Sequence, residues 1–205
     1  MRIGIFGGSF DPVHQGHLVV AECCREQARL DRVVFVPTAI QPFKQDRQPA
    51  AAHHRAEMLG LAVGGNPAFA VSTLELDRGG VSYTVDTLTA MRDAHTGDEL
   101  HLILGPDALA SLPGWREPSR ILELARVIAV QRDALDNVAA IVQTSGLAAL
   151  LGPERARDIV AEKVAVPTIG IRSSDLRALV AQGRSIRYRT PRAVEQYIAH
   201  HGLYK

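Results

Sequence analysis

Cysteine is scarce in this sequence. The chain of 205 residues has two, Cys23 and Cys24, and they are neighbours. Adjacent residues of a helix or strand direct their Cβ atoms apart, so neighbouring cysteines rarely form a disulfide with each other. Two thiols also cannot complete a zinc site without other ligands. A disulfide-stabilised fold of the small secreted kind is therefore excluded.

Excess charge and long apolar runs are lacking as well. Lys and Arg number 23 against 22 Asp and Glu, which gives a formal net charge of +1. A nearly neutral chain is a poor general binder of nucleic acid, so any anion site must be local. No apolar run is long enough to span a membrane, and Met1–Phe6 leads into a glycine turn without the apolar core of a signal peptide. We expect a soluble cytoplasmic protein that binds neither nucleic acid nor membrane, and a homo-oligomer is compatible with this composition.

The remaining composition is that of an ordinary globular protein. Hydrophobic residues make up 46% of the chain and charged residues 22%. The length fits one α/β domain that buries roughly 70% of its unfolded surface. There is no internal repeat and no low-complexity linker. We therefore expect a single domain over 1–205, with 173–205 as a C-terminal helical subregion.

Short apolar runs alternate with helical patterns along the chain. The expected strands are Arg2–Phe6, Arg32–Val36, Phe69–Ser72, His101–Leu104, Val127–Val130 and Ile169–Ile171. The expected helices are Gly16–Leu30, Ala51–Val63, Thr84–His95, Arg120–Ala125, Asn137–Leu151, Pro153–Lys163, Ser173–Gln182 and Pro191–His200. This alternation predicts an α/β fold with a mostly parallel sheet and helices on both of its faces.

The most informative segment is the turn GGSFDPVHQGH, residues 7–17, between the first strand and the first helix. Its glycines let the backbone approach a ligand, and unpaired N–H groups at a helix N-terminus attract phosphate. His14 before the helix and His17 in its first turn could add imidazole donors to the same phosphate chain. Metal ligation by Asp11, His14 and His17 is one alternative, and histidines that only cap the helix or lie on the surface are another. The spacing matches neither GxGxxG nor GxxxxGK[ST], so neither of those phosphate sites is predicted.

The turn resembles the HxGH motif of nucleotidyltransferases, and the chain resembles the bacterial nicotinate-nucleotide adenylyltransferase family over most of residues 3–130 and 169–204. Further matching segments occur in the expected order: Phe35–Pro37 to Lys44, His54–Leu59, Arg78–Leu88, Leu104–Leu109, Trp115, Ile171–Arg177 and Gly183–Tyr188. The resemblance implies a Rossmann-like nucleotidyltransferase fold. It also implies transfer of the adenylyl group of ATP to nicotinate mononucleotide, which forms deamido-NAD and pyrophosphate in NAD biosynthesis.

The resemblance implies roles for individual residues. The residues implied in catalysis are His14, His17, Lys44 and Arg177. Those implied in ATP binding are Gly7, Gly8, Ser9, Phe10, His17, Gly105, Asp107, Ser173, Ser174 and Arg177, with Asp107 accepting hydrogen bonds from the ribose. Those implied in mononucleotide binding are Lys44, Tyr83, Thr84 and Trp115, with the tryptophan stacked on the pyridine ring. Mg²⁺ is expected to enter with ATP and to need no protein ligand.

Each of these roles has an ordinary structural alternative. Lys44 could be a solvated loop charge, and Trp115 a core or interface residue. Asp107 could cap a helix that starts at Ala108, and Thr84 could cap its own helix; both capping roles are compatible with ligand binding. A basic cluster near the C-terminus is expected to be a solvated face, with a phosphate contact as the alternative; its members are Arg184, Arg187, Arg189 and Arg192.

Three positions depart from the family pattern. Phe43 stands where the family usually has a histidine, Pro106 replaces a small residue, and Arg172 begins a segment that is Ser-Ser-Thr in the family. These departures bear on single phosphate and ribose contacts, not on the reaction. Other functions to be tested are nucleotidyl transfer to a different acceptor, nucleotide sensing without chemistry, and metal-dependent hydrolysis.

Overall fold

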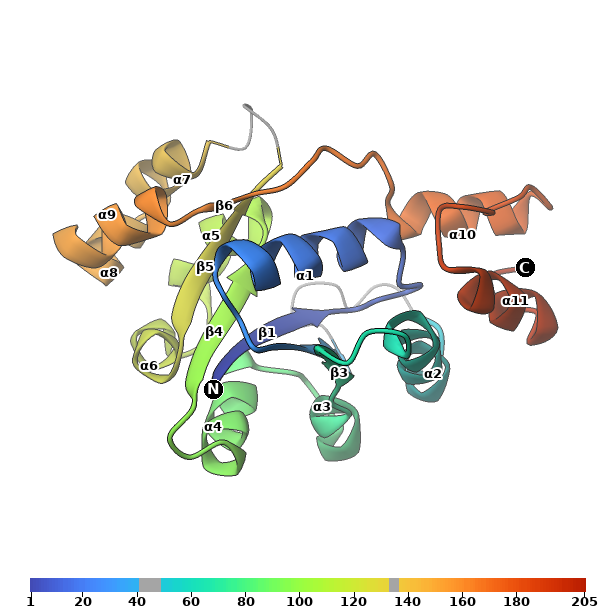
Figure 1. Ribbon diagram of the computed structural model, residues 1–205, viewed down its shortest axis with the longest axis horizontal. Coiled ribbons are helices and arrows are strands. Elements are labelled where there is room, and N and C mark those ends of the chain that lie inside the picture. The colour runs from blue at the N-terminus through green and yellow to red at the C-terminus, as the bar shows by residue number, and fades with distance from the viewer. Residues whose placement is uncertain (41–48, 133–136) are drawn as a thin grey trace. The chain divides into compact units, whose positions relative to one another are not determined.

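The computed structural model describes residues 1–40, 49–132 and 137–205 of the chain (Figure 1). Within these residues, six strands form one sheet in the order β3-β2-β1-β4-β5-β6. The strands are β1 (Arg2–Gly8), β2 (Arg32–Pro37), β3 (Phe69–Val71), β4 (Glu99–Leu104), β5 (Arg126–Gln131) and β6 (Val164–Ala165). The β1–β4, β4–β5 and β5–β6 pairs are parallel, and the strand order is that of a Rossmann-like sheet. The expected α/β fold is confirmed.

Helices connect these strands and complete the C-terminal part of the chain. They are α1 (Gln15–Gln27), α2 (Ala52–Val63), α3 (Leu74–Arg78), α4 (Thr84–Ala94), α5 (Pro106–Ser111), α6 (Pro118–Leu124), α7 (Val138–Thr144), α8 (Leu147–Leu151), α9 (Pro153–Ala161), α10 (Ser173–Ala181) and α11 (Arg192–His200), with a 3-10 turn η1 (Leu112–Gly114). In the part of the chain that the structure describes, no helix is long and apolar enough to cross a membrane.

The described chain divides into two compact units. The first comprises Met1–Phe6, Val20–Val33 and Tyr83–Thr168. In its sheet, β1 pairs with β4, with Arg2 opposite Glu99. Strand β4 pairs in turn with β5, with Leu104 opposite Ala129. The middle strands are continuous apolar runs, which is typical of parallel strands buried on both faces. Their buried side chains include Leu100, Leu102, Ile103, Leu104, Ile128, Ala129 and Val130.

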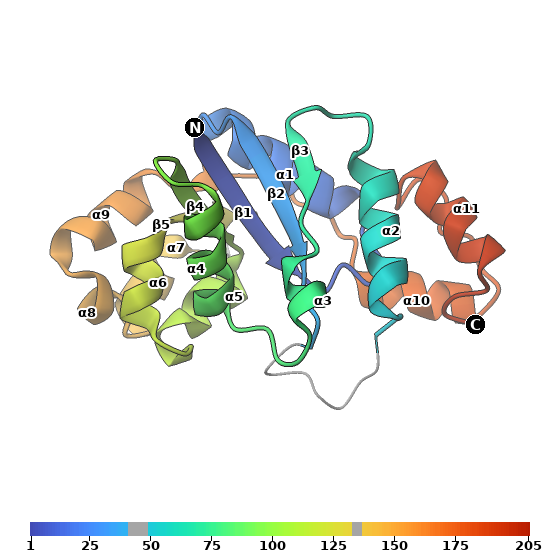
Figure 2. The same cartoon turned by 90° about the horizontal axis from the view of Figure 1, so that it is seen from below.

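The second unit comprises Gly7–Val19, Val34–Ser82 and Ile169–Lys205. It contains the carboxyl end of β1, the start of α1, most of β2, and β3, α2, α3, α10 and α11. Helices α2 and α11 pack against each other, as Figure 2 shows for the cyan and red ribbons. The buried apolar side chains of this unit include Phe10, Val13, Phe35, Val36, Met58, Leu59, Leu176, Val194 and Ile198. The expected C-terminal subregion, 173–205, lies wholly within this unit.

The expected strand at Ile169–Ile171 is wrong. The last strand of the described chain is β6, in which Val164 pairs with Val130 and Ala165 with Gln131. At residues 169–171 the chain instead makes a tight turn, in which the Ile171 N–H donates to the Ile169 carbonyl at 2.8 Å. The glycine between two isoleucines favours such a turn and weakens a strand, so the apolar pattern alone was misleading here.

The single helix expected over Asn137–Leu151 is divided into α7 and α8. The Asn137 side chain caps α7 by accepting from the Ala140 N–H at 3.0 Å. Gly146 then takes a φ of 80°, in the left-handed region that glycine adopts without strain. The apolar periodicity continues across this glycine, but the backbone direction does not.

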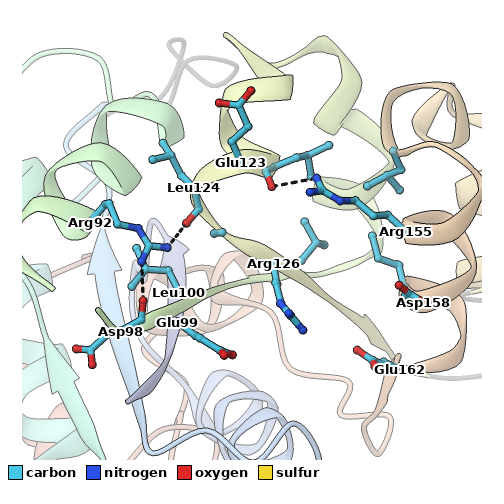
Figure 3. A pocket seen from close by; sticks show the side chains of 15 residues that line it. Arg92, Asp98, Glu99, Leu100, Glu123, Leu124, Arg126, Arg155, Asp158 and Glu162 are labelled. Carbon is cyan, nitrogen blue, oxygen red and sulfur yellow. Dashed lines mark hydrogen bonds between the residues drawn. The ribbon is translucent and has the colours of Figure 1, made fainter. Parts of the chain in front are cut away.

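A cavity of about 440 Å³ lies in the first unit beside the amino ends of β4 and β5 (Figure 3). Arg92 crosses one side of it, donating to the carbonyls of Asp98 at 2.5 Å and Leu124 at 2.6 Å. On the other side, Arg155 donates to the carbonyl of Leu122 at 3.3 Å. These two guanidinium groups link α4 and α9 to α6 through backbone acceptors, and Arg92 also holds Asp98, the residue before β4. The cavity wall is thus a structural joint, at the strand ends opposite to the glycine turns that follow β1 and β4.

Candidate functional site

The turn at residues 7–17 belongs to the second unit and leads from β1 into α1. Phe10 is 1% exposed and has a left-handed backbone with a φ of 45°. Its ring packs edge-on against the His17 ring, with 5.0 Å between centroids. A Cβ at Gly8 would lie 3.1 Å from the Phe10 ring, and one at Gly16 would lie 3.1 Å from the His14 ring. A side chain at either position would press against the aromatic ring beside it, which would have to shift by a few tenths of an ångström.

The two histidines of the turn form a stacked pair. Their ring centroids are 3.7 Å apart, with 23° between the ring planes. The backbone N–H of His14 donates to Nδ1 of His17 at 3.2 Å. Because an accepting Nδ1 carries no proton, the neutral His17 ring holds its proton on Nε2. Nδ1 of His14 is buried and has no hydrogen-bond partner among the residues that the structure describes.

Burial keeps this pair neutral. It lowers the pKa of His14 to about 4. Burial, and after it the neighbouring His14 ring, lower the pKa of His17 well below its usual 6.5. Both rings are therefore uncharged near neutral pH, and a nearby phosphate would favour their protonated forms. The pair can respond to an anion either as neutral donors or by taking up a proton.

Acid should destabilise the protein through this pair. Between pH 6.5 and about 4, His14 is protonated in the unfolded chain and neutral in the folded one. The unfolded state binds more protons in this window, so the free energy of unfolding should fall as the pH falls, by up to about 3 kcal/mol for His14. We expect the free energy of unfolding of His14→Asn, measured by urea denaturation without nucleotide, to decline less than that of the wild type between pH 6.5 and 4. His200→Asn, at an exposed position, is the control; an unchanged slope in His14→Asn would contradict the expectation.

Side chains from the C-terminal segment hold the backbone of the turn. The three consecutive carbonyls of residues 11–13 each accept a hydrogen bond from it. Arg177 Nη1 donates to the first, Ser173 Oγ to the second at 2.9 Å, and Thr190 Oγ1 to the third at 2.8 Å. We call this arrangement the carbonyl clamp. It brings Ser173 and Arg177 to the histidine turn as expected, and adds Thr190, which is 2% exposed and which no local sequence signal indicates.

The first amides of α1 are partly used within the protein. The Gln15 N–H donates to the Arg189 carbonyl at 3.0 Å, and the His17 N–H to the His14 carbonyl at 2.9 Å. Free amides at this helix N-terminus were expected to be phosphate donors, but these two are satisfied. These two amides are therefore engaged within the protein and are not free to bind an anion.

Arg55 of α2 fixes the turn from the other side. Its side chain is 1% exposed. The guanidinium donates to the carbonyls of Ala50 at 3.0 Å, Ser9 at 2.9 Å and Ala39 at 3.5 Å. Burial lowers the pKa of Arg55, while the charge of Asp11 opposes that shift. A guanidinium buried on carbonyls in this way is a structural cross-link between the turn and α2, and sequence analysis assigned it no role.

The geometry does not support metal ligation by Asp11, His14 and His17. The Asp11 carboxylate accepts from the Ala50 N–H at 3.1 Å instead of joining the imidazoles. Among residues 1–40, 49–132 and 137–205, no three His, Cys, Asp or Glu side chains are arranged to hold a metal ion.

In the first unit, Tyr83 and Thr84 lie at the N-terminus of α4. Tyr83 is the N-cap residue with extended backbone, and Thr84 is the first helical residue, so Thr84 is not the cap. The Arg116 guanidinium lies 4.8 Å from the centre of the Tyr83 ring. It is also 3.6 Å from a carboxylate oxygen of Asp86 and 3.5 Å from one of Glu117. Arg116 thus places a cation beside Tyr83, and the two carboxylates largely offset its charge. Sequence analysis did not identify Arg116.

Trp115 follows the turn η1 in the same unit, next in the chain to Arg116. Its backbone N–H donates to the Leu112 carbonyl at 3.0 Å. Its indole Nε1–H donates to Ser111 Oγ at 3.0 Å. The ring is half-buried, so it is held in place and is not a core residue. This is compatible with the expected stacking role.

The segment Gly105–Asp107 follows β4. Gly105 is the N-cap of α5, Pro106 is its first residue and Asp107 lies in its first turn. The capping alternative for Asp107 is therefore wrong, because Pro106 starts the helix one residue before it; proline suits the first helical position, which needs no N–H donor. The Asp107 side chain is exposed.

The remaining expected site residues are placed as follows. Lys44 and Phe43 lie outside the described residues. Ser174 is exposed, and its Oγ donates to Asp175 Oδ1 at 3.1 Å. Arg172 is the exposed N-cap residue of α10. Of the C-terminal arginines, Arg192 and Arg187 pair with Glu195 at 2.7 Å and 3.6 Å, as on a solvated face.

Comparison with known proteins shows which family the chain belongs to. The cytidylyltransferase-like family model matches residues 5–179. Three relatives carry the name "Probable nicotinate-nucleotide adenylyltransferase". The relative from Thermomicrobium roseum is 45% identical, with 100% of this chain and 92% of its own covered. The one from a Roseiflexus species is 48% identical, with 99% of this chain and 98% of its own covered. One from Thermus thermophilus is 44% identical, and both chains are covered completely.

A solved structure shares the fold. Plasmodium falciparum nicotinic acid mononucleotide adenylyltransferase complexed with NaAD matches with a TM-score of 0.73 and 18% identity, over 99% of this chain and 97% of that one. The chain therefore belongs to the cytidylyltransferase-like family, among its nicotinate-nucleotide adenylyltransferases. The resemblance read from the histidine turn is confirmed.

Proposed function

We propose that this protein transfers the adenylyl group of ATP to nicotinate mononucleotide. An oxygen of the mononucleotide 5′-phosphate attacks the α-phosphorus of ATP and forms a new P–O bond. The bond from that phosphorus to the oxygen bridging to the β-phosphate breaks, so pyrophosphate leaves and deamido-NAD remains. No protein nucleophile takes part, and catalysis consists of positioning and charge stabilisation. The observation that carries the proposal is the neutral, stacked His14–His17 pair at the start of α1.

The second unit supplies the phosphate-binding side chains in the proposed reaction. His17 donates from Nε2 to phosphate oxygens on which negative charge increases, and Arg177 adds a fixed cation beside the same turn. At the start of α10, two serines lie beside the ATP phosphates in this proposal. They are Ser173, which bonds to the turn, and the exposed Ser174. The family resemblance also implies Lys44, which lies outside the described residues, as a cation for the triphosphate. Gly7, Gly8, Ser9 and Phe10 shape the turn.

We propose that Mg²⁺ enters as part of the ATP substrate. It prefers oxygen ligands and usually retains several waters on nucleotide phosphates, where it offsets their charge. The described residues contain no group of three ligating side chains to hold it. We therefore assign the ligands of the ion to phosphate oxygens and water, and the two imidazoles serve as hydrogen-bond donors.

The first unit supplies the mononucleotide and ribose contacts. Trp115 stacks on the pyridine ring, and the amides at the start of α4, beside Tyr83 and Thr84, receive the ring carboxylate. Because Asp86 and Glu117 offset the Arg116 charge, these amides are the main source of selectivity. Asp107, exposed in the first turn of α5, accepts from the adenosine ribose.

The enzyme should prefer nicotinate over nicotinamide mononucleotide. A carboxamide facing these amides would direct its NH₂ at a donor, which costs about 2–3 kcal/mol in a dry pocket, or roughly 30- to 150-fold in kcat/KM. Parallel kcat/KM measurements on the two mononucleotides test this. Trp115→Ala should lower both values without changing their ratio, because the ring stacks on either pyridine. Equal values in the wild type would contradict the choice of substrate and leave adenylyl transfer intact.

One assay separates the proposed function from its alternatives. The protein is incubated with ATP, Mg²⁺ and each mononucleotide, and dinucleotide and pyrophosphate are quantified. Equal amounts of deamido-NAD and pyrophosphate are expected. Pyrophosphate without dinucleotide would indicate hydrolysis, and ATP binding without turnover would indicate a sensor.

A further inference from the structure

The C-terminal end of the chain turns back onto the histidine turn. Helix α11 ends in a Schellman motif, in which the Leu203 N–H donates to the Ile198 carbonyl at 3.1 Å and the Gly202 N–H to the Ala199 carbonyl at 3.4 Å. Gly202 has the left-handed φ of 61° that this motif needs. Two residues later Tyr204 also has a left-handed backbone, with a φ of 65°. Such a conformation is strained for tyrosine, so surrounding contacts must hold it.

The contact that holds Tyr204 is with Asp11. The Tyr204 hydroxyl donates to Asp11 Oδ1 at 2.7 Å. Asp11 is 4% exposed, and the same oxygen accepts from the Ala50 N–H at 3.1 Å. Burial, and after it the bond to Asp11, raise the pKa of Tyr204, so the hydroxyl stays protonated and acts as the donor.

Asp11 connects this tyrosine to the phosphate-binding arginine. Its other carboxylate oxygen, Oδ2, lies 3.4 Å from Arg177 Nη1, and its backbone carbonyl accepts from the same nitrogen in the carbonyl clamp. The orientation of the carboxylate therefore decides how strongly Arg177 is drawn toward Asp11. With both donors on Oδ1, the carboxylate is fixed in one rotamer. Without the tyrosine hydroxyl the carboxylate could rotate, which would change its 3.4 Å contact with Arg177 and with it the position of the guanidinium.

We propose that Tyr204 is a positioning residue for the ATP step, which acts through Asp11 on Arg177. This inference rests on the proposed function. The tyrosine acts at a distance from the substrate: its hydroxyl restrains the carboxylate, and the restrained carboxylate holds the Arg177 guanidinium in a fixed place beside the histidine turn. The C-terminal residues are thereby part of the ATP site although they lie far from the histidine turn in sequence, with a separation of 193 between the bonded pair.

A pair of tyrosine variants tests the inference in the full-length protein. Tyr204→Phe removes the hydroxyl on Asp11, whereas Tyr197→Phe removes a hydroxyl that bonds to His54 Nδ1 at 2.8 Å in the same C-terminal segment. We expect Tyr204→Phe to lose about tenfold or more in kcat/KM for ATP, with the KM for nicotinate mononucleotide within about twofold of wild type. Tyr197→Phe should keep all kinetic constants within about twofold, and the two variants should have similar melting temperatures.

An Asp11→Asn background gives the second measurement. If the hydroxyl acts through the carboxylate, adding Tyr204→Phe to Asp11→Asn should change kcat/KM for ATP by less than about twofold. The inference is overturned if Tyr204→Phe behaves like Tyr197→Phe, if its effect persists in the Asp11→Asn background, or if it melts well below Tyr197→Phe. A wild-type protein that makes no dinucleotide would instead overturn the proposed function.

Discussion

Replacing His17 with alanine is expected to lower kcat about 10²-fold or more. The loss of one preorganised donor to a developing phosphate charge costs roughly 3 kcal/mol in the transition state. His17 is suited to this role because its Nδ1 accepts from the His14 backbone and thereby fixes the proton on Nε2. Alanine favours the first turn of a helix, so α1 should be retained.

The measurement for His17→Ala is steady-state kinetics with saturating ATP and nicotinate mononucleotide. His53→Ala is the matched control, since His53 is an exposed histidine in the first turn of α2. It should keep kcat within about twofold. A His17→Ala protein with a normal circular dichroism spectrum and near-normal kcat would remove His17 from the catalytic residues.

Replacing Arg55 with methionine is expected to lower the free energy of unfolding by about 3–5 kcal/mol. The 1% exposed guanidinium serves the carbonyls of Ser9, Ala39 and Ala50. Its removal leaves these acceptors without their donor and takes away one of the two cations that the described chain places near Asp11, the other being Arg177. Methionine fills the volume but supplies no donor. Of the variants considered, this one should have the largest effect on stability.

Urea denaturation measures the effect of Arg55→Met, because a stability change moves the midpoint while the slope stays constant. Arg157→Met is the control. Its Nε also donates to a carbonyl, that of Pro153 at 3.1 Å, but in an exposed position on α9. The control should change stability by less than about 0.5 kcal/mol. Equal midpoints for the two variants would show that Arg55 is not a structural cross-link.

Sequence reasoning found the features that are local. The strand at β1, the glycine turn and His14 and His17 lie within residues 2–17, so composition and spacing are enough to predict them. The turn at Ile169–Ile171 was predicted as a strand because an apolar pattern does not say whether a partner strand is within reach. Asp107 was given a capping alternative because proline at the first position of α5 was not used as a helix start.

The residues that complete the site depend on contacts between distant parts of the chain. Thr190 bonds to Val13 across 177 positions, and Ser173 to Pro12 across 161. No periodicity or spacing in either segment indicates the other. Arg116 similarly acquires its place from packing beside Tyr83, 33 positions earlier in the printed sequence. The places of Thr190 and Arg116 follow only from the tertiary structure, whereas Ser173 was expected near the turn from the family resemblance alone.

The carbonyl clamp also has a consequence for biosynthesis. The histidine turn is translated first, but the groups that fasten its backbone are at positions 173, 177 and 190. A nascent chain therefore carries both imidazoles, with their supporting loop unfastened, until residue 190 has been translated. Termination between the histidine turn and Ser173 would yield a polypeptide that has the histidine motif and lacks all three groups of the clamp.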